Sequence, residues 1–475
     1  MSAHFRVTAL SCAVLLGACS LAPKYEVPSS PAVDAYKEAG EWMPAVPADT
    51  QPRGAWWEAF GDAKLNDLQE QLREGSEDLH GAVARYEQAR AIAHRARSDI
   101  FPTVSVSASA TRENNSANAP LAGGVRTTGN DLVAAANLAW EVDLFGRLRN
   151  TAAAAGDRAQ ASAADLAALD LSLRAELATD YFALRGADAT LQLLEATVQD
   201  YDRAFELTRN RYAGGIAAAT DVDQAETQRQ SARAQLAAVR LQRSLLEHAI
   251  AVLLGLPPSS FNLESALFVG EPPPLDAGLP STLLQRRPDI ASAERAVAAA
   301  NAEIGVARAA WFPLFALGGS IGYEATQSSA WFEAPSRYWS AGPAAIVPVL
   351  DFGRRSGETR RAHAAYDEAV AAYRQAALTA YQEVEDNLAA LHHLADALKA
   401  DEAAAASAQR SAYHADRRYA AGVADYIEVT TTHTASLLAQ RAALETRVQR
   451  MSAAVGLVRA LGGGWTAEQL DQPVL

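Results

Sequence analysis

Charged and aromatic side chains capable of specific chemistry recur at two matching places in the chain. Arg211-Tyr212 and Arg418-Tyr419 each follow a long run of helix-forming residues, and Asp425 and Glu428 come soon after the second pair. A guanidinium close to carboxylates forms charge-assisted hydrogen bonds. No HExxH motif, P-loop or pair of neighbouring cysteines accompanies these residues, and no cofactor or metal site is indicated. The sequence therefore predicts ion-pair chemistry and no enzymatic activity.

A second chemical feature lies near the N-terminus. His4 and Arg6 precede a short apolar run that is typical of a signal peptide, and the run ends in Leu16-Gly17-Ala18-Cys19. Small residues before a cysteine predict cleavage after residue 18 and attachment of lipid to Cys19. The alternative is an ordinary signal peptide with a chance cysteine. Ser20 is not the aspartate of an inner-membrane retention signal, which favours the outer membrane.

Composition limits the remaining possibilities. The chain has 475 residues and a net charge of -14, without a basic block, which argues against nucleic-acid binding. It has two cysteines, and loss of Cys12 with the signal would leave no partner for a disulfide. After the signal no apolar stretch is long enough for a transmembrane helix. Six prolines between residues 20 and 55 predict an extended tether rather than a packed element.

The chain is an internal duplication. Phe-Gly-Arg at 145–147 returns 207 positions later at 352–354, and Arg-Tyr-Ala at 211–213 returns at 418–420 with the same offset. Upstream, Phe-Pro at 101–102 returns at 312–313, an offset of 211. Repeats of this kind predict that one long supersecondary unit occurs twice.

Each unit is expected to contain a helix, a β-hairpin, a very long helix, a tight turn and a shorter returning helix. The long helices are predicted at about 147–213 and 354–420, because neither interval contains proline and both are rich in Ala, Leu, Glu, Gln and Arg. The shorter helices are expected at about 62–98, 221–254, 289–310 and 425–461. Their lengths suggest that two short helices stacked end to end match one long helix.

The hairpins, at about 102–144 and 313–351, alternate apolar side chains with small or polar ones. Segments of about ten residues with one apolar face are typical of transmembrane β-barrel strands. A soluble sandwich with a half-buried sheet is the alternative. Four strands cannot close a barrel, so a membrane sheet requires oligomerisation: two copies would give eight strands and three would give twelve, with a lumen.

Taken together, these segments resemble the outer-membrane factors of bacterial tripartite efflux systems, the TolC family, and in particular its lipoprotein branch. The resemblance rests on the order of weak motifs along the mature chain: Cys19, Trp56-Trp57, Asp143-Leu144-Phe145-Gly146, Arg211-Tyr212-Ala213-Gly214-Gly215, Arg286-Arg287-Pro288-Asp289-Ile290 and Arg418-Tyr419 with Gly422.

The resemblance implies an α+β membrane protein: a homotrimer in which a 12-stranded β-barrel in outer-membrane lipid is continuous with a periplasmic α-helical barrel of long coiled-coil helices. The expected organisation is a signal peptide (1–18), a lipid-anchored extended segment (19–57), repeat 1 (58–257), an equatorial linker (258–287), repeat 2 (288–462) and an equatorial tail (463–475). The implied partners are a periplasmic adaptor protein and an inner-membrane pump.

The resemblance also assigns roles to the two helix-hairpin tips. Adaptor contact is expected from Arg211, Tyr212, Gly214, Gly215, Ala420, Gly422 and Val423. The periplasmic gate is expected from Arg417, Arg418, Tyr419, Asp425 and Glu428. The alternative is that Arg and Tyr at a helix end only offset the helix dipole and pack. Thr430-Thr431-Thr432-His433 stands where family members often carry an acidic residue, and His433 by itself is expected to be a solvated helix residue.

Three functions follow from these patterns. The first is a passive channel that exports small molecules delivered by a pump and an adaptor. The second is a structural coiled-coil outer-membrane lipoprotein without channel activity, in which the hairpins would be soluble. The third, an enzyme, is disfavoured because the carboxylates lie in Ala/Arg-rich helices and have the spacing of solvated faces.

Overall fold

The computed structural model describes residues 20–30, 36–39, 54–118, 126–266, 270–274 and 286–465. Cys19 and the predicted signal peptide lie outside these residues. The chain forms two compact units: one comprises residues 1–29, 85–162 and 292–373, and the other comprises 30–84, 163–291 and 374–475. We call them the sheet unit and the hairpin unit.

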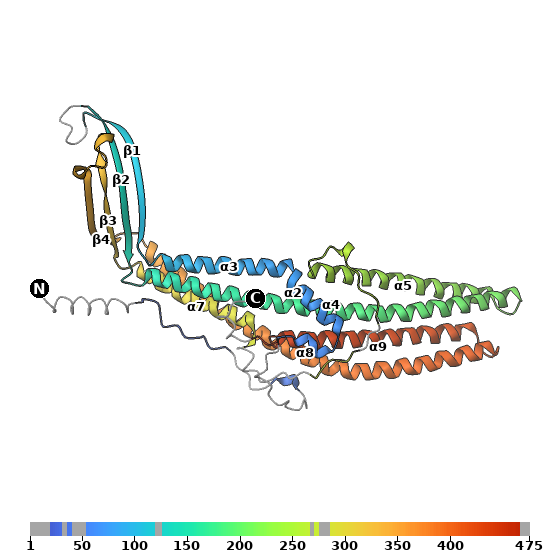
Figure 1. The fold of residues 1–475 in the computed structure, drawn as a ribbon. Helices are drawn as coiled ribbons and strands as arrows, with labels where there is room; N and C mark the ends of the chain where they lie inside the picture. The colour runs from blue at the N-terminus through green and yellow to red at the C-terminus, as the bar shows by residue number, and fades with distance from the viewer. Residues whose placement is uncertain are drawn as a thin grey trace. The chain divides into compact units, whose positions relative to one another are not determined.

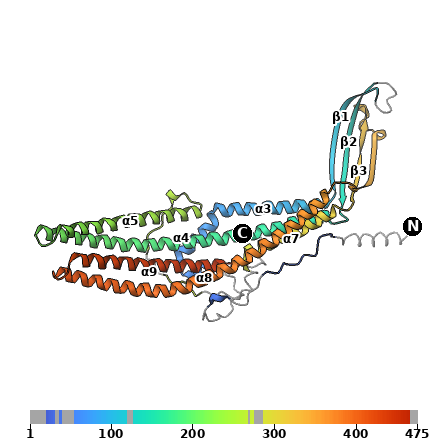
Figure 2. The same ribbon diagram turned by 180° about the vertical axis from the view of Figure 1, so that it is seen from behind.

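The sheet unit contains one four-stranded antiparallel sheet (Figures 1 and 2). Its strands are β1 (Thr103–Asn115), β2 (Thr127–Val142), β3 (Leu314–Ala325) and β4 (Arg337–Ile346), in the order β1-β2-β3-β4. The two sequence hairpins are therefore joined through β2 and β3, one strand from each repeat. Short 3-10 helices, η4 (Ser328–Ala330) and η5 (Ala334–Ser336), lie in the second hairpin loop.

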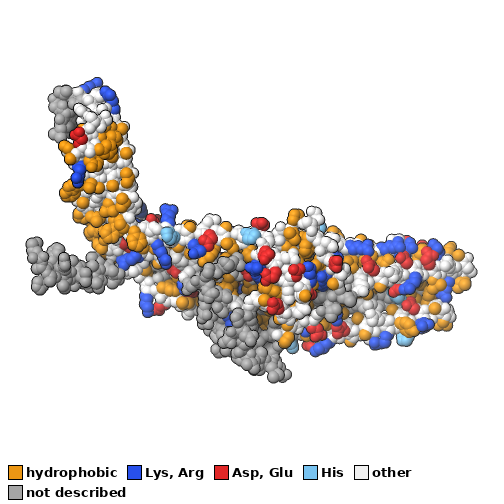
Figure 3. Space-filling model, in the orientation of Figure 1, with side chains coloured by type: hydrophobic (Ala, Val, Ile, Leu, Met, Phe, Trp, Pro, Cys, Tyr) orange, Lys and Arg blue, Asp and Glu red, His pale blue; other side chains and the backbone are white. Residues whose placement is uncertain are grey.

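The register of the strands places the alternating apolar residues on one face. Val106 lies opposite Ala136, which lies opposite Ile321, which in turn lies opposite Trp339. Directly opposed residues in antiparallel strands share a face, so the predicted apolar sets of all four strands form one continuous surface. Figure 3 shows hydrophobic side chains gathered over these strands.

The opposite face carries small and polar side chains that bond to one another. Asn137 Nδ2 donates to Ser107 Oγ across β1 and β2 at 3.1 Å. Gly322 on this face is closely covered, because a Cβ there would lie 2.3 Å from the carbonyl oxygen of Ala134 and 2.9 Å from Cβ of Ala135. Glycine is therefore required at this point of contact between the two repeats.

Two long helices run through the chain, α4 (Arg147–Ala213) and α8 (Arg354–Ala420). Each is followed by a shorter helix, α5 (Ala219–Leu253) or α9 (Tyr426–Ala460). In the hairpin unit, α4 and α5 lie side by side as one antiparallel helical hairpin, and α8 and α9 form the other (Figures 1 and 2). The observed bounds of the long helices coincide with the predicted ranges. The returning helices begin and end within two residues of them.

The predicted helix at 62–98 is wrong as a single element. It is divided into α2 (Ala63–Gly75) and α3 (Glu77–Ser98), because Ser76 adopts an extended conformation with ψ 115°. The break occurs where α5 ends: a Cβ on Gly75 would lie 2.3 Å from the carbonyl oxygen of Leu254. Two chain segments meet here too closely for side chains.

The corresponding junction in the second repeat joins α9 to α7 (Pro288–Ala309). A Cβ on Gly462 would lie 2.0 Å from the carbonyl oxygen of Arg286. Arg287 Nη1 donates to the carbonyl oxygen of Ala460 at 3.0 Å and to Glu383 at 2.6 Å. A cation thus binds the carbonyl oxygen of Ala460 at the end of α9. In both repeats short helices meet end to end, as their lengths suggested.

For residues 20–30 and 36–39, the described part of the predicted tether, the expectation of an unpacked segment is also wrong. Residues 20–30 are extended, but Asn301 Nδ2 donates to the carbonyl oxygen of Pro23 at 2.9 Å and the Tyr25 hydroxyl donates to Glu294. Further along, Tyr36 is buried beside η1 (Lys37–Ala39) and Trp56 is buried in η2 (Trp56–Phe60). Proline prevents regular pairing of such a segment but not its packing along a helix.

A charged network holds the start of the predicted equatorial linker, near η3 (Pro258–Ser260). Asp188, whose side chain is almost fully buried, accepts from Arg185 at 3.0 Å and from Arg243 at 2.7 Å. The same arginines donate to the carbonyl oxygens of Glu264 and Leu263. The buried charges are therefore paired, and the linker backbone satisfies the remaining donors.

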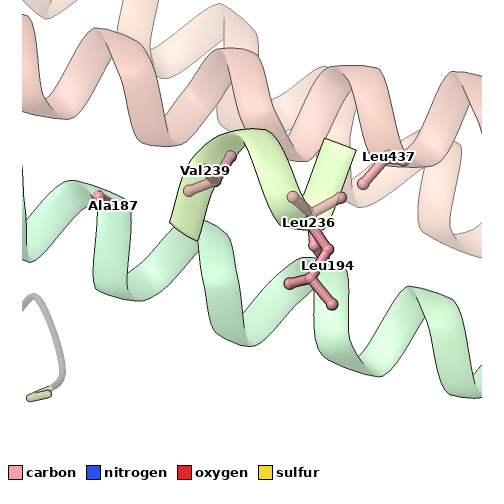
Figure 4. Close-up of a cluster of buried hydrophobic side chains, with 5 residues drawn as sticks. All are labelled: Ala187, Leu194, Leu236, Val239 and Leu437. Carbon is pink, nitrogen blue, oxygen red and sulfur yellow. The ribbon is translucent and has the colours of Figure 1, made fainter. Parts of the chain in front are cut away.

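The helical hairpins share a narrow apolar core. Leu194 of α4 and Leu236 of α5 point toward one another, and Leu437 of α9 completes the cluster (Figure 4). Nearby, a Cβ on Gly186 would lie 2.3 Å from Cγ2 of Val448, so α4 and α9 touch directly at this glycine. Among the described residues, no helix is both long and apolar enough to cross a membrane.

Candidate functional site

The turns at the ends of α4 and α8 have the same backbone structure. The N–H of Ile216 donates to the carbonyl oxygen of Arg211 at 2.8 Å, and the N–H of Val423 donates to that of Arg418 at 3.0 Å. Gly215 and Gly422 adopt φ values of 74° and 77°, in the left-handed region. Each tip is therefore a Schellman motif, which explains why glycine recurs at this spacing.

The returning helices begin with acidic residues, but differently from each other. α5 is capped at Ala218, and the carboxylate of Asp221 accepts a hydrogen bond from the N–H of Ala218 at 3.3 Å. In α9, Asp425 is the capping residue and its side chain makes no capping hydrogen bond. The carboxylate of Asp425 thus makes no capping contact at the start of α9.

The predicted adaptor-contact residues fall into two groups. Arg211 is half-buried, whereas the others are exposed on the two turns. Exposed apolar side chains stand beside the glycines, with Ile216 78% and Val423 66% accessible. The exposed set on the tips is Tyr212, Gly214, Gly215, Ala420, Gly422 and Val423.

The half-buried Arg211 connects the two tips. Its guanidinium lies over the ring of Tyr419, with Cζ 4.5 Å from the ring centroid, and Nη1 donates to the carbonyl oxygen of Tyr419 at 3.2 Å. The hydroxyls of Thr208 and Tyr419 are 3.4 Å apart. Residues of α4 therefore hold the last turn of α8 through charge, ring and hydroxyl contacts together.

Beneath this contact lies an apolar cluster. Tyr419 packs on Tyr426, with ring centroids 5.5 Å apart and planes at 62°, against Ala225, Ala415 and Val429. Burial raises the pKa of Tyr426 to about 12. Tyr419, which the sequence assigned to the gate, is thus a buried link between the hairpins.

The predicted gate charges are only partly brought together. Arg418 Nη1 lies 3.0 Å from Glu428 Oε1, joining the last turn of α8 to the first turn of α9. Arg417 instead donates to the hydroxyl of Tyr413 at 3.2 Å, within α8. Of the two arginines proposed to hold the tip, Arg418 pairs with an acidic residue of α9.

A groove of about 350 Å³ lies between α4 and the second hairpin, near the tips. Tyr201, Tyr426, Asp416 and His433 line it, and His433 Nε2 lies 2.8 Å from Asp416 Oδ1. Sequence reasoning treated His433 as an isolated residue and did not identify Tyr201, Asp416, Thr208 or Tyr426. Asp416 and His433 occupy facing positions on antiparallel helices, so the helical hairpin could have indicated this pair.

Two features bear on catalysis. Gly318-Gly319-Ser320-Ile321-Gly322 has the letters of the GxSxG nucleophile motif, but it lies within β3 and the Ser320 hydroxyl bonds to that of Tyr338 at 3.4 Å. The motif requires a turn between a strand and a helix. Within the described ranges no group of His, Cys, Asp and Glu could hold a metal ion.

Comparison with known proteins identifies the family. A model of the family described as outer membrane efflux protein matches residues 68–256 and 279–463, and the chain belongs to this family. It is 34% identical over 466 residues to outer membrane protein OprJ of Pseudomonas aeruginosa, covering 97% of this chain and 96% of OprJ.

Solved structures agree. The outer-membrane channel OprN is 30% identical, with a TM-score of 0.88 over 94% of this chain and 100% of OprN. The CmeC outer membrane channel of Campylobacter jejuni is 25% identical, with a TM-score of 0.89 over 94% of this chain and 96% of CmeC. The resemblance to the outer-membrane factor family is confirmed, and the chain belongs to a family of transport proteins, not to a class of enzymes.

Proposed function

We propose that this protein is the outer-membrane channel of a tripartite efflux system, a passive conduit through which small molecules leave the cell. The observation that carries the proposal is the sheet, in which a continuous apolar face spans four strands and the opposite face is small and polar. Such a sheet suits lipid on one side and a wet lumen on the other. The relatives named above are outer-membrane proteins and channels, which does not favour a purely structural lipoprotein.

The functional assembly in this proposal is a homotrimer. Three copies of the four-stranded sheet form a 12-stranded barrel, and the helices form a periplasmic tube continuous with it. The exposed apolar residues of the two tips, Ile216 and Val423, offer a repeated surface to a periplasmic adaptor. The Arg418–Glu428 pair and Asp425 form the charged gate, and an inner-membrane pump supplies the cargo.

Channel activity is testable with purified protein in planar lipid bilayers. A trimeric barrel is expected to migrate as an SDS-resistant oligomer that dissociates on heating, and to conduct ions. Wild type can be compared with an Arg418→Ala/Asp425→Ala variant, in which the tip is loosened. Absence of conductance from both proteins, despite correct insertion, would exclude the channel.

We further propose that Cys19 carries the lipid that anchors the mature N-terminus. The next residue, Ser20, donates its hydroxyl to Asn150 Oδ1 at 2.8 Å, in the first turn of α4 and shortly after β2. An acyl chain on Cys19 would begin one residue from this contact. Metabolic labelling with a palmitate analogue should label wild type and not Cys19→Ser, while Cys12→Ser serves as the control. Equal labelling of the Cys19→Ser variant rejects the assignment.

A further inference from the structure

The charged residues of the four strands are divided between the two faces of the sheet. Arg112 lies on the apolar face, six positions after Val106 along β1. Arg337 lies on the same face, two positions before Trp339 along β4. The acidic residues lie on the polar face: Glu113, Asp131, Glu141 and Glu324. Within the described strands, positive side chains therefore occur only on the face that the proposed function assigns to lipid.

Arg337 lies at the border of the apolar surface. It is the first residue of β4 and is thus at the opposite end of this strand from α8. Directly opposite it on β3 is Tyr323, whose ring packs against Phe332 of the loop, with ring centroids 5.6 Å apart. Phe332 and Trp339 are 66% and 77% exposed. Because tryptophan and tyrosine on lipid-facing surfaces gather at the level of the headgroups, this setting favours a headgroup position for Arg337.

Arg112 has different surroundings. It lies opposite Asn130 on β2. In the next pair on the same face, Asn114 Nδ2 donates to Thr128 Oγ1 at 2.7 Å, so amide and hydroxyl groups replace the apolar side chains. The apolar surface has therefore ended on β1 before Arg112 is reached. Of the two strand arginines, Arg337 is the one that adjoins aromatic rings and the apolar surface together.

The guanidinium of Arg337 is exposed and makes no ion pair or side-chain hydrogen bond within the described ranges. Where the strands meet the helices, by contrast, Arg147 pairs with Glu141 and Arg355 pairs with Asp351. An arginine on the lipid face of a barrel is strongly unfavourable at the middle of the bilayer and is tolerated near the headgroups. At that level the guanidinium of Arg337 is available to an anionic group of the membrane.

We infer that Arg337 binds the phosphate group of an anionic lipid whose acyl chains lie on the apolar face of the sheet, beside Trp339. The inference rests on the proposed function, which places this face in lipid, and goes beyond it by assigning a lipid site. The lipid belongs to the outer leaflet, because the helices at the other end of the strands lie in the periplasm. A guanidinium binds two phosphate oxygens at once, and the exposed rings offer contact area to the chains.

Quenching of tryptophan fluorescence by brominated lipids tests the site in the intact protein. Purified full-length protein is reconstituted in phosphatidylcholine vesicles that contain increasing fractions of dibrominated phosphatidic acid. A parallel series contains dibrominated phosphatidylcholine at the same ionic strength. Bromine on the acyl chains quenches tryptophans that lie against lipid, as the exposed Trp339 is expected to do. The ratio of the two quenching curves gives the preference of the protein surface for an anionic headgroup.

Arg337→Gln removes the guanidinium, and Ser340→Asp is the matched control. Ser340 lies opposite Ser320 on the polar face, so the aspartate changes the net charge equally but from the other side of β4. Wild type and Ser340→Asp are expected to prefer dibrominated phosphatidic acid about fivefold, and Arg337→Gln should show a ratio of about one. Arg337→Lys should keep part of the preference, because lysine retains the charge without the planar fork.

An equal ratio for wild type and Arg337→Gln overturns the lipid site. So does an equal loss of preference in Ser340→Asp, which would indicate long-range charge rather than binding on the lipid face. Replacing chloride by inorganic phosphate at the same ionic strength should leave the ratio unchanged. Loss of the preference in phosphate would show that Arg337 binds a free anion instead of a lipid.

Folding of each variant is checked by its SDS-resistant, heat-dissociable oligomer. If Arg337→Gln does not form this oligomer, Arg337→Lys decides the question, and a ratio equal to that of wild type then rejects a site built on the guanidinium. Failure of both brominated lipids to quench wild type contradicts the proposed function itself, because the apolar face would then not lie in lipid.

Discussion

Arg211 of α4 lies over the ring of Tyr419 of α8 and donates to its carbonyl oxygen, although the two residues are 208 positions apart in the sequence. One side chain thereby links the ends of both helical hairpins. We expect Arg211→Ala to loosen the second tip, because a cation–π contact and a charged hydrogen bond worth about 1–2 kcal/mol are lost together. Planar-bilayer conductance should rise several-fold.

A matched control lies one half-turn earlier on the same helix. Arg209 pairs with Glu206 within α4. Arg209→Ala should therefore leave conductance close to that of wild type. Arg211→Lys should give an intermediate value, since lysine retains the charge but not the planar group that stacks on the ring. A conductance increase in Arg209→Ala equal to that in Arg211→Ala would contradict the link.

The ion pair between Arg418 and Glu428 predicts a charge-dependent gate. Because both side chains are partly exposed, Glu428→Gln should change the free energy of unfolding by less than about 1 kcal/mol. The change in conductance, expressed as a free energy, should exceed this change in the free energy of unfolding. The change in conductance should become smaller at high salt. The exchange Arg418→Glu/Glu428→Arg should restore the wild-type conductance more closely than either single reversal.

Close packing at Gly186 predicts that replacing this glycine by alanine destabilises the folded protein. A Cβ there would overlap Val448, so Gly186→Ala should lower stability by about 1–3 kcal/mol in spite of its better helix propensity. Val448→Ala removes the obstacle, and in that background Gly186→Ala should become stabilising. Gly156, on the same helix with nothing within 4 Å of its Cβ position, is the control. Gly156→Ala should stabilise by about 1 kcal/mol. Thermal unfolding measures all four variants.

Asp180 predicts a pH dependence of stability. Burial, and then the charge of Glu176, raise its pKa to about 6. The folded state therefore binds a proton that the unfolded state, with a pKa of about 4, has already released. The stabilisation of the folded state by this proton is fully present below a pH of about 4 and is lost as the pH rises through about 6.

Asp180→Asn should remove this dependence and increase stability at pH 8 by about 1–2 kcal/mol, allowing for solvent screening. Asparagine already stands at the equivalent position of the second repeat, Asn387, where it donates to the carbonyl oxygen of Glu383. Exposed Asp165 on the same helix provides the control variant Asp165→Asn. If the melting temperatures of wild type and Asp180→Asn change with pH in the same way between pH 4 and 8, this carboxyl does not titrate in that range.

Local signals in the sequence were sufficient for the long helices and the strands. The long helices have no proline and end at a glycine that accepts a left-handed φ, so both ends of α4 and α8 could be assigned. Alternation in the hairpins identified the apolar face that the register confirms. These features depend on residues that are neighbours in the chain.

Contacts between distant segments were not predictable in the same way. The break at Ser76 arises because Gly75 meets the end of α5, and a glycine in the sequence does not reveal which distant segment approaches it. The Arg211–Tyr419 contact depends on how two helical hairpins pack. The N-terminal residues looked unpacked because proline content reports on regular structure, whereas Tyr25 and Asn301 form their bonds through side chains.

Gly322 has a consequence for how the copies recognise each other during assembly. A duplicated chain risks exchanging equivalent strands, since β1 of a neighbour resembles β3 and could compete for β2. Thr111 stands in β1 where Gly322 stands in β3, and its side chain would collide with the backbone at Ala134. We therefore expect this edge of β2 to accept β3 and to disfavour a β1 strand, because only glycine fits beside the backbone of β2 at this point.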